Sequence, residues 1–209
     1  MRVIIARHAE THQNEDNVLQ GSGTGNGSAL TEFGKRQSVE LCNELLGEFD
    51  VKSIIVSPAR RTRDTIEPMK HCASTFIEDE NIREIDCGDW EGRSIARLEQ
   101  ECKNEWEIWK THPLSFAFPG GESINDVFSR TDQFLKGLLK SNELSDVLLI
   151  SHSATISTLI ANILSVELSE AWNTRLGYHN NAEFSVFNFG NSTELLDYSL
   201  KNRNHLTST

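Results

Sequence analysis

Short apolar runs alternate with longer amphipathic stretches along the chain, and each pattern predicts a different secondary structure. Residues 3–5 are three β-branched residues in a row, which is typical of a strand buried on both faces of a parallel sheet. Similar runs, or alternations of apolar and polar residues, predict strands at residues 53–56, 73–77, 146–150, 183–188 and 195–200. We expect the last two strands to pair as a hairpin.

Helical periodicity fills the stretches between these strands. Thr31 is a suitable N-cap for a first long helix, with Glu32 in its first turn. Ser57 and Pro58 form a second start signal, an N-cap residue before a proline, directly after the strand at 53–56. Apolar residues at helical spacing predict further helices at residues 94–110, 122–140 and 154–164.

This alternation predicts an α/β fold with three layers, in which helices cover both faces of a mostly parallel central sheet. One domain of this kind can build a substantial core from 209 residues. No long-period repeat is visible, which argues against a solenoid or a propeller. We therefore expect a single domain over residues 1–209, with a helical, cap-like insert around residues 94–140.

The charge balance narrows the classes of partner. Lysine and arginine number 20, aspartate and glutamate number 31, and the formal net charge is −11. Because no basic stretch could follow a phosphate backbone, we expect no nucleic-acid partner. The same acidity would repel a phosphorylated small molecule at long range, so an anion site must depend on a few focused arginines and backbone donors.

Cysteine spacing and hydropathy bear on the compartment. The four cysteines include no CxxC pair, and no secretory signal precedes Arg7, which favours reduced thiols in the cytoplasm. No apolar run approaches the roughly 20 residues that span a bilayer, so we expect no membrane-spanning segment. The sequence leaves open whether the chain forms a homo-oligomer.

Reactive side chains stand where predicted strands end. Arg7 and His8 follow the first strand, and His152 follows a later one. In open α/β sheets, ligands bind beyond the carboxyl ends of the strands, so these side chains should lie close together. Arg60 falls in the first turn of the helix after a third strand, and Glu84 lies in a segment rich in turn formers.

Such a set suits phosphoryl transfer without a metal. A neutral imidazole can attack phosphorus, arginines and a second histidine can neutralise the equatorial oxygens, and a carboxylic acid can protonate the leaving oxygen. The basic cluster of Arg60, Arg61 and Arg63 can give only one or two side chains to one site, because successive helical residues point about 100° apart.

Several motifs in a fixed order give the chain a resemblance to a known family. They are RHAET followed by Asn14 and Gln20, LTEFG, SPARRTRDT, Glu84 ahead of GDWEG, PGGES, SHSATI and the closing NRNHL. The ordered set resembles the histidine phosphatase superfamily, in the branch related to cofactor-dependent phosphoglycerate mutase. It extends from Arg2 to about Leu206 and implies a phosphoglycerate mutase-like fold.

The resemblance also implies roles for individual residues. His8 would be the nucleophile that becomes a phosphohistidine, and Glu84 the general acid and later the base. The residues implied around the phosphate are Arg7, Arg60, His152 and Asn14. Gln20 and Ser153 would contact the substrate, a small phosphorylated metabolite, and no metal or other cofactor is implied.

The chain departs from the family pattern at several places near this site, among them Ser153 and Ala154, where the family usually has two small, glycine-like positions. Ala9 stands where the family usually has glycine, and the glycine-rich stretch of residues 21–29 is longer than the corresponding loop. We expect a flexible rim here, because neither GxGxxG nor a GK[ST] ending marks the stretch as a phosphate cradle.

Three other interpretations compete with a phosphatase. A zinc site could use His8 and His12, but HxxxH on a loop does not place both rings on one face, and no third ligand is evident. A non-catalytic module that binds phosphorylated partners would not need Glu84. For a 2,3-bisphosphoglycerate-dependent mutase, the resemblance implies a longer insert than the 68 positions between Glu84 and His152.

The aromatic residues of the insert do not identify the substrate. They either wall a pocket for a molecule bulkier than a triose or belong to the core. These residues are Trp106, Trp109, Phe116 and Phe118.

Overall fold

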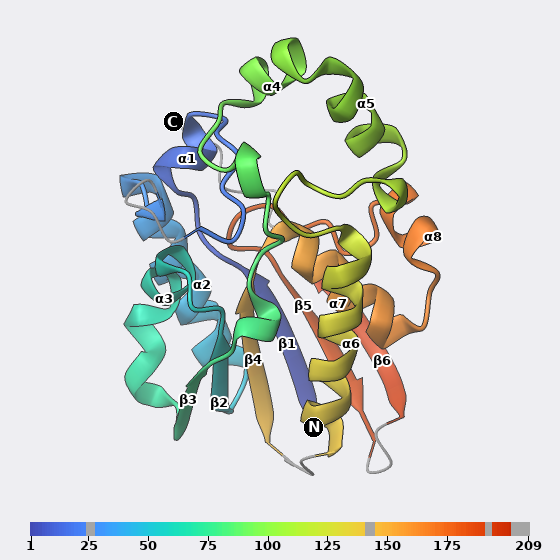
Figure 1. The fold of residues 1–209 in the computed structure, drawn as a ribbon. Helices are drawn as coiled ribbons and strands as arrows, with labels where there is room; N and C mark the ends of the chain where they lie inside the picture. The colour runs from blue at the N-terminus through green and yellow to red at the C-terminus, as the bar shows by residue number, and fades with distance from the viewer. Residues whose placement is uncertain (24–27, 141–144, 191–193, 202–209) are drawn as a thin grey trace.

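A six-stranded mixed sheet forms the centre of the computed structural model, which describes residues 1–23, 28–140, 145–190 and 194–201 (Figure 1). Its order is β3-β2-β4-β1-β5-β6, with parallel pairing from β3 to β1 and antiparallel pairing at β5 and β6. The strands are β1 (Arg2–Arg7), β2 (Val51–Val56), β3 (Thr75–Glu78), β4 (Asp146–Ser151), β5 (Phe184–Phe189) and β6 (Leu195–Lys201). Each predicted strand agrees with an observed one to within two residues at either end.

Helices cover both faces of the sheet and its upper edge (Figure 1). The α-helices are α1 (His12–Glu15), α2 (Glu32–Glu48), α3 (Arg60–Ile66), α4 (Ile95–Glu101), α5 (Lys103–Thr111), α6 (Ile124–Lys140), α7 (Ser153–Leu164) and α8 (Leu168–Asn173). Short 3₁₀ helices are η2 (Glu67–Cys72), η3 (Glu80–Ile82), η4 (Gly88–Trp90) and η5 (Pro113–Ser115). In the part of the chain so described, none of these helices is long and apolar enough to cross a bilayer.

The pleat of β1 explains why its run is apolar throughout. Val3 and Ile5 belong to the core beneath α6 and α7, while Ile4 and Ala6 belong to the opposite core with α2. All four residues are fully buried, since side chains of a strand alternate between the two faces and both faces are covered. The predicted three-layer α/β fold is thus confirmed.

The α4–α5 region lies above the sheet, at the edge where the parallel strands end (Figure 1). A separate aromatic core joins it to the rest of the molecule. The ring of Trp90 is at its centre, 5.9 Å from that of Trp106, 5.3 Å from that of Phe116 and 5.4 Å from that of Phe118. The sequence did not decide whether Phe116 lines a pocket or belongs to the core, and these contacts place it in the core.

Two helix predictions need correction. The single helix expected at residues 94–110 is interrupted at Cys102, whose φ of −123° and ψ of 42° are not helical. The break sets α5 at an angle to α4, so that Trp109 packs against Trp172 of α8, 5.2 Å away. Ser57 is not an N-cap either, because α3 begins two residues beyond Pro58, after Ala59.

Candidate active site

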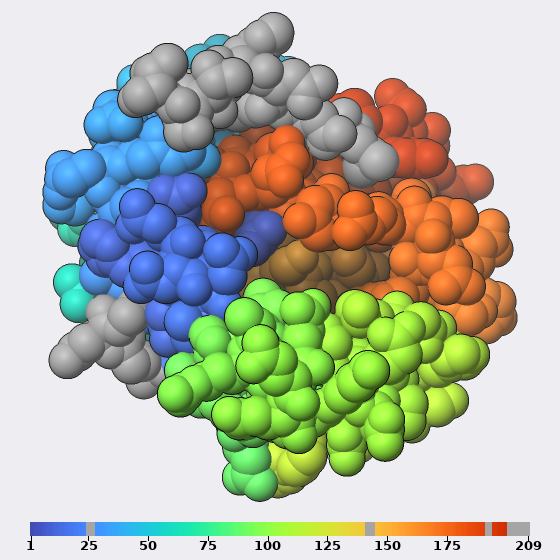
Figure 2. All heavy atoms as spheres, turned by 90° about the horizontal axis from the view of Figure 1, so that it is seen from above, coloured from blue at the N-terminus to red at the C-terminus, as the bar shows by residue number. Residues whose placement is uncertain are grey.

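A cavity of about 500 Å³ opens at the carboxyl ends of β1 and β4, beneath the α4–α5 region. Seen from above, the hollow is bordered by N-terminal residues in blue, the α4–α5 region in green and residues near α8 in orange (Figure 2). Its polar lining comprises Arg7, His8, Asn14, Gln20, Arg61, Glu84, Ser153, Ser157, Arg175 and Tyr178. Six of the eight predicted site residues are therefore brought together, and Arg60 and His152 are not on the wall.

His8 lies directly beyond the end of β1 and is only 3% exposed. Its Nδ1 is 2.8 Å from the carbonyl oxygen of Ala9, which can only accept, so Nδ1 carries the proton and Nε2 keeps its lone pair. Burial, followed by the positive charges of Arg61 and Arg7, lowers the pKa of His8 well below its ordinary value. The imidazole is thus held neutral, in a defined tautomer, with the lone pair of Nε2 free.

Arg61 occupies the position that the sequence assigned to Arg60. Its side chain is 1% exposed, and its Nε donates to Nδ1 of His152 over 3.0 Å. Its Nη2 donates to the carbonyl oxygen of Gly21 over 2.7 Å, and its Nη1 to Ser28 Oγ over 3.3 Å. Burial lowers the pKa of Arg61 to about 10, so the guanidinium remains charged at neutral pH.

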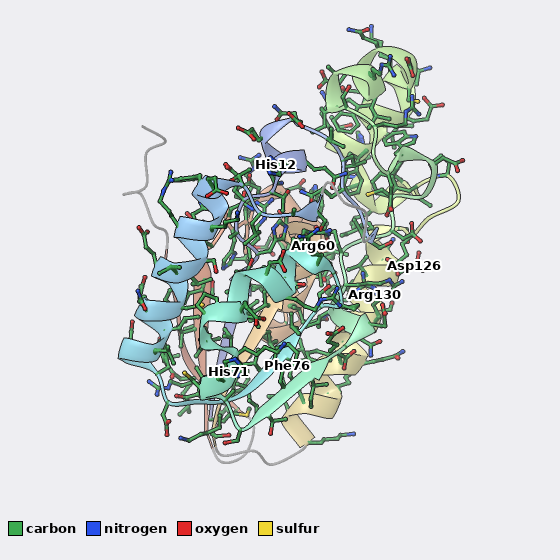
Figure 3. The ribbon with its side chains drawn as sticks, turned by 90° about the vertical axis from the view of Figure 1, so that its left-hand side faces the viewer. His12, Arg60, His71, Phe76, Asp126 and Arg130 are labelled. Carbon is green, nitrogen blue, oxygen red and sulfur yellow. The ribbon has the colours of Figure 1, made fainter. Side chains whose placement is uncertain are left out.

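The expectation for Arg60 is wrong. Its side chain is 49% exposed and pairs with Asp64 on the outer face of α3 (Figure 3). One residue along a helix changes direction by about 100°, so when Arg61 faces the cavity its neighbour must face elsewhere.

His152 stands behind His8, with ring centroids 5.3 Å apart, and is completely buried. Its Nδ1 accepts from Arg61, so Nε2 carries the proton and donates to Ser57 Oγ over 2.7 Å. Burial, and then the charge of Arg61, lowers the pKa of His152 well below its ordinary value. Both ring nitrogens are engaged, and the histidine orients Arg61 from behind.

Arg7 faces the cavity with an unsatisfied donor. Its Nη1 donates to the carbonyl oxygen of His179 over 2.8 Å, whereas its buried Nε has no hydrogen-bond partner among the described residues. A buried N–H without a partner costs free energy that an anionic oxygen in the cavity would recover. Together with Arg61, Arg7 marks this end of the cavity as an anion site.

Glu84 approaches the cavity from the turn after β3 and caps α7. Its carboxylate accepts from the backbone N–H groups of Ala154, over 3.3 Å, and Thr155, over 3.2 Å. These are helix N-terminal donors that lack a partner within α7, so the carboxylate and the helix fix each other. The backbone is held as well, since Arg130 Nη2 donates to the carbonyl oxygen of Glu84 over 3.2 Å.

The three predicted substrate contacts, Asn14, Gln20 and Ser153, all line the cavity. Asn14 Oδ1 accepts from the hydroxyl of Thr11 over 3.0 Å, so the NH₂ group is the part of this side chain left to donate to a ligand. The buried Oε1 of Gln20 has no hydrogen-bond partner in the described part of the chain. It is suited to accept from a substrate hydroxyl or amine.

Two of the departures from the family pattern, at Ala9 and in the glycine-rich stretch, have different outcomes. Ala9 is fully buried and is not among the residues with positive φ, so its methyl group causes no backbone strain. Residues 24–27 of the glycine-rich stretch lie outside the described residues. Gly21, which is described, has φ of +59° and faces Glu91, whose carboxylate accepts from the backbone N–H of Ser22 over 2.7 Å.

Sequence reasoning missed Arg61, Trp172, Arg175 and Tyr178 on the cavity wall. The helix phase of α3 would have identified Arg61 only if its start had been known. The other three follow α7 in the sequence and carry no motif, so no local signal pointed to them.

The zinc interpretation does not fit this geometry. His12 is exposed on α1, where its Nδ1 lies 3.5 Å from a carboxylate oxygen of Glu15, whereas His8 is buried. Among the residues that the structure describes, no three His, Cys, Asp or Glu side chains cluster in a way that could hold a metal ion.

Comparisons with known proteins show which family the chain resembles. Residues 3–199 match the model of the histidine phosphatase superfamily (branch 1). Phosphoserine phosphatase 1 of Hydrogenobacter thermophilus is 30% identical over 188 residues, which are 89% of this chain and 85% of that protein. The probable phosphoglycerate mutase GpmB of Escherichia coli is 29% identical over 176 residues, covering 84% of this chain and 79% of that protein.

The fold has close counterparts among solved structures. A mycobacterial glucosyl-3-phosphoglycerate phosphatase in complex with VO₃ superposes with a TM-score of 0.82 at 25% identity, over 97% of this chain and 98% of that one.

Proposed function

The chain belongs to the histidine phosphatase superfamily, and on that premise we propose that it hydrolyses small-molecule phosphate monoesters through a phosphohistidine at His8. The observation that carries the proposal is the neutral, tautomer-fixed imidazole of His8 in a cavity that also holds Arg7, Arg61 and Glu84. Such a set supplies the nucleophile, the anion site and the proton carrier that the reaction needs.

In the first step, Nε2 of His8 attacks phosphorus as the bond from phosphorus to the leaving oxygen breaks. Glu84 is the group placed to deliver a proton to that oxygen, and the alcohol departs. In the second step, a water molecule attacks the phosphohistidine while Glu84 takes one of its protons. Inorganic phosphate leaves, and both side chains return to their starting states.

Charge in the transition state falls on the three equatorial oxygens, where Arg7 and Arg61 can neutralise it. Arg7 offers its unpartnered Nε, and Arg61 is held in place by His152 and by backbone carbonyl groups. Asn14 adds a neutral donor, while Gln20 and Ser153 lie on the wall where they can contact substrate. His152 thus acts as a positioning residue for Arg61.

The proposal also assigns the reaction to a domain and a compartment. We place the reaction in one domain, with α4 and α5 of the insert expected around residues 94–140 as a cap over the cavity, whereas α6 of that insert packs on a face of the sheet (Figure 1). All four cysteines are free thiols, which supports the reducing cytoplasm as the compartment in which the protein works.

A phosphoglycerate mutase is the second candidate, because a relative of that name is 29% identical to this chain. A mutase must keep water away from its phosphohistidine while the product reorients. The compact spacing of 68 positions between Glu84 and His152 favours hydrolysis instead.

The test measures phosphate release and the interconversion of 3- and 2-phosphoglycerate side by side, with and without 2,3-bisphosphoglycerate. We expect release of phosphate from simple esters, and ³²P label that survives alkaline quenching on His8 but is absent from His8→Ala. Interconversion about 100-fold faster than the best hydrolysis, a barrier difference of roughly 2.7 kcal/mol, would establish the mutase instead. Label on serine would contradict the phosphohistidine.

A further inference from the structure

The part of the cavity away from His8 differs in polarity from the part that holds the charged residues. Its wall is apolar and aromatic, and it is contributed by the loop after α1, by the cap and by α8. The aromatic and aliphatic residues of this wall are Leu19, Ile95, Trp106, Trp109, Phe118, Ala171 and Trp172. A leaving group large enough to extend from a phosphate near His8 into this part of the cavity would contact them.

The aromatic rings form a continuous surface. The ring of Trp109 lies 4.8 Å from that of Phe118 and 5.2 Å from that of Trp172, so residues from α5 and α8 meet above the cavity. Trp90, which is 2% exposed and does not line the cavity, supplies the packing centre of the cap. Trp109 and Trp172 are only partly buried, so the faces they leave uncovered are available to a ligand.

The charges on the wall disfavour a leaving group that carries a positive charge. Among the described residues that line the cavity, Glu84 is the single carboxylate, and it is already engaged by α7. The ammonium group of an amino-acid phosphate would therefore find no carboxylate of its own here. Arg175 stands at the exposed rim, with its guanidinium 4.9 Å from the ring centre of Tyr178, and has no carboxylate partner among the described residues.

From these observations we propose that the preferred substrates are phosphate monoesters whose leaving group carries an aromatic ring, which packs against Trp109 and Trp172. The inference rests on the proposed phosphatase function and names the substrate class of the same site. An aromatic ring gains binding free energy when it leaves water and packs against the face of a tryptophan. Its binding also removes water from the apolar wall.

The experiment compares 2-phenylethyl phosphate with ethyl phosphate. Both esters release a primary alcohol, so the chemical steps make similar demands on His8 and Glu84, and the ring is the main difference. We expect kcat/KM to be about 10- to 100-fold higher for the phenylethyl ester, since apolar groups of this size give selectivity of that order. O-phosphoserine should fall below both.

Substitutions of the two tryptophans test where the aromatic ring of the substrate binds. Trp109→Ala and Trp172→Ala should each lower kcat/KM for 2-phenylethyl phosphate by about 10-fold and change that for ethyl phosphate by less than about 2-fold. Trp109→Phe should recover most of the loss. Ile108→Ala is the matched control, because Ile108 lies on the same helix with its side chain 42% exposed, and it should affect neither ester.

The outcomes separate the two proposals. If neither ester is hydrolysed, the phosphatase function itself fails. If both are hydrolysed with equal kcat/KM, or phosphoserine is preferred, the function stands and the aromatic leaving group is refuted. The comparison of esters with the unmodified protein decides this even where a tryptophan variant does not fold.

Discussion

Arg60 and Arg61 are adjacent in the sequence, yet the fold gives them opposite environments. Arg61 is buried between His152 and the backbone of Gly21, with three of its nitrogen atoms engaged. Arg60 lies on the outer face of α3, paired with Asp64 at 3.2 Å. An exposed ion pair of this kind contributes little to stability, whereas a buried guanidinium near His8 can act on a transferring phosphoryl group in the proposed reaction.

We predict that Arg61→Ala lowers kcat/KM for a phosphate monoester by about 100-fold or more, because one cationic donor to the equatorial oxygens is lost. Arg60→Ala, the matched control one residue away, should stay within about 2-fold of the wild type. Steady-state kinetics with p-nitrophenyl phosphate measures both. A large loss in Arg60→Ala with normal activity in Arg61→Ala would reverse the assignment.

At the scale of elements, α2 is fixed against the loop that follows His8. The backbone N–H of Thr31 donates to the carbonyl oxygen of Glu10 over 3.1 Å, and the N–H of Glu10 donates to Gln37 Oε1 over 2.9 Å. Gly34, in the first turn of α2, is so close that a Cβ there would lie 2.0 Å from the carbonyl oxygen of Glu10. The helix thus holds the loop that follows His8 through contacts that leave no space for a side chain at Gly34.

We predict that Gly34→Ala destabilises the protein by about 1–3 kcal/mol and reduces activity, since backbone must move to admit the methyl group. Gly47→Ala is the control in the same helix, where an added Cβ meets nothing within 4 Å. That substitution should stabilise the protein by about 0.5–1 kcal/mol by restricting the unfolded chain. Urea unfolding of both variants checks the pair, and equal stability of the two would contradict the close packing.

For the molecule as a whole, the site imposes a pH dependence on stability. His8 and His152 are buried beside Arg61, and burial, then that charge, lowers the pKa of each well below its ordinary value. In the unfolded chain both would titrate near pH 6.5. Below that pH, the unfolded state binds protons that the native state does not, so stability is highest above about pH 6.5 and falls as the pH is lowered.

We predict that at about pH 5.5 unfolding takes up about one more proton in the wild type than in His8→Asn. The slope of unfolding free energy against pH, from urea titrations between about pH 5 and 7, measures this difference. His71→Asn is the control, because His71 is exposed on η2 (Figure 3), and it should keep the wild-type slope. An unchanged slope in His8→Asn would mean that the native protein binds a proton at His8.

The sequence by itself determined the layers of the fold and part of the site. Helices cover both faces of strands such as residues 3–5, so every residue of such a strand has to be apolar. A run of consecutive apolar residues in the sequence therefore predicts the buried strand. His8 and Glu84 were found from motifs, and both reach the cavity. The strand ends were placed to within two residues because burial stops where the sheet does.

Only the tertiary structure decided which arginine faces the cavity and which residues meet across it. α3 begins after Ala59 instead of at Pro58, and two residues of helix change direction by about 200°, so a small error in the start selects the wrong side chain. Ser57 turns from an expected cap into a partner of His152. Trp172 joins Trp109 from a helix about 60 positions away, a contact that no local pattern encodes because it depends on how separate elements pack.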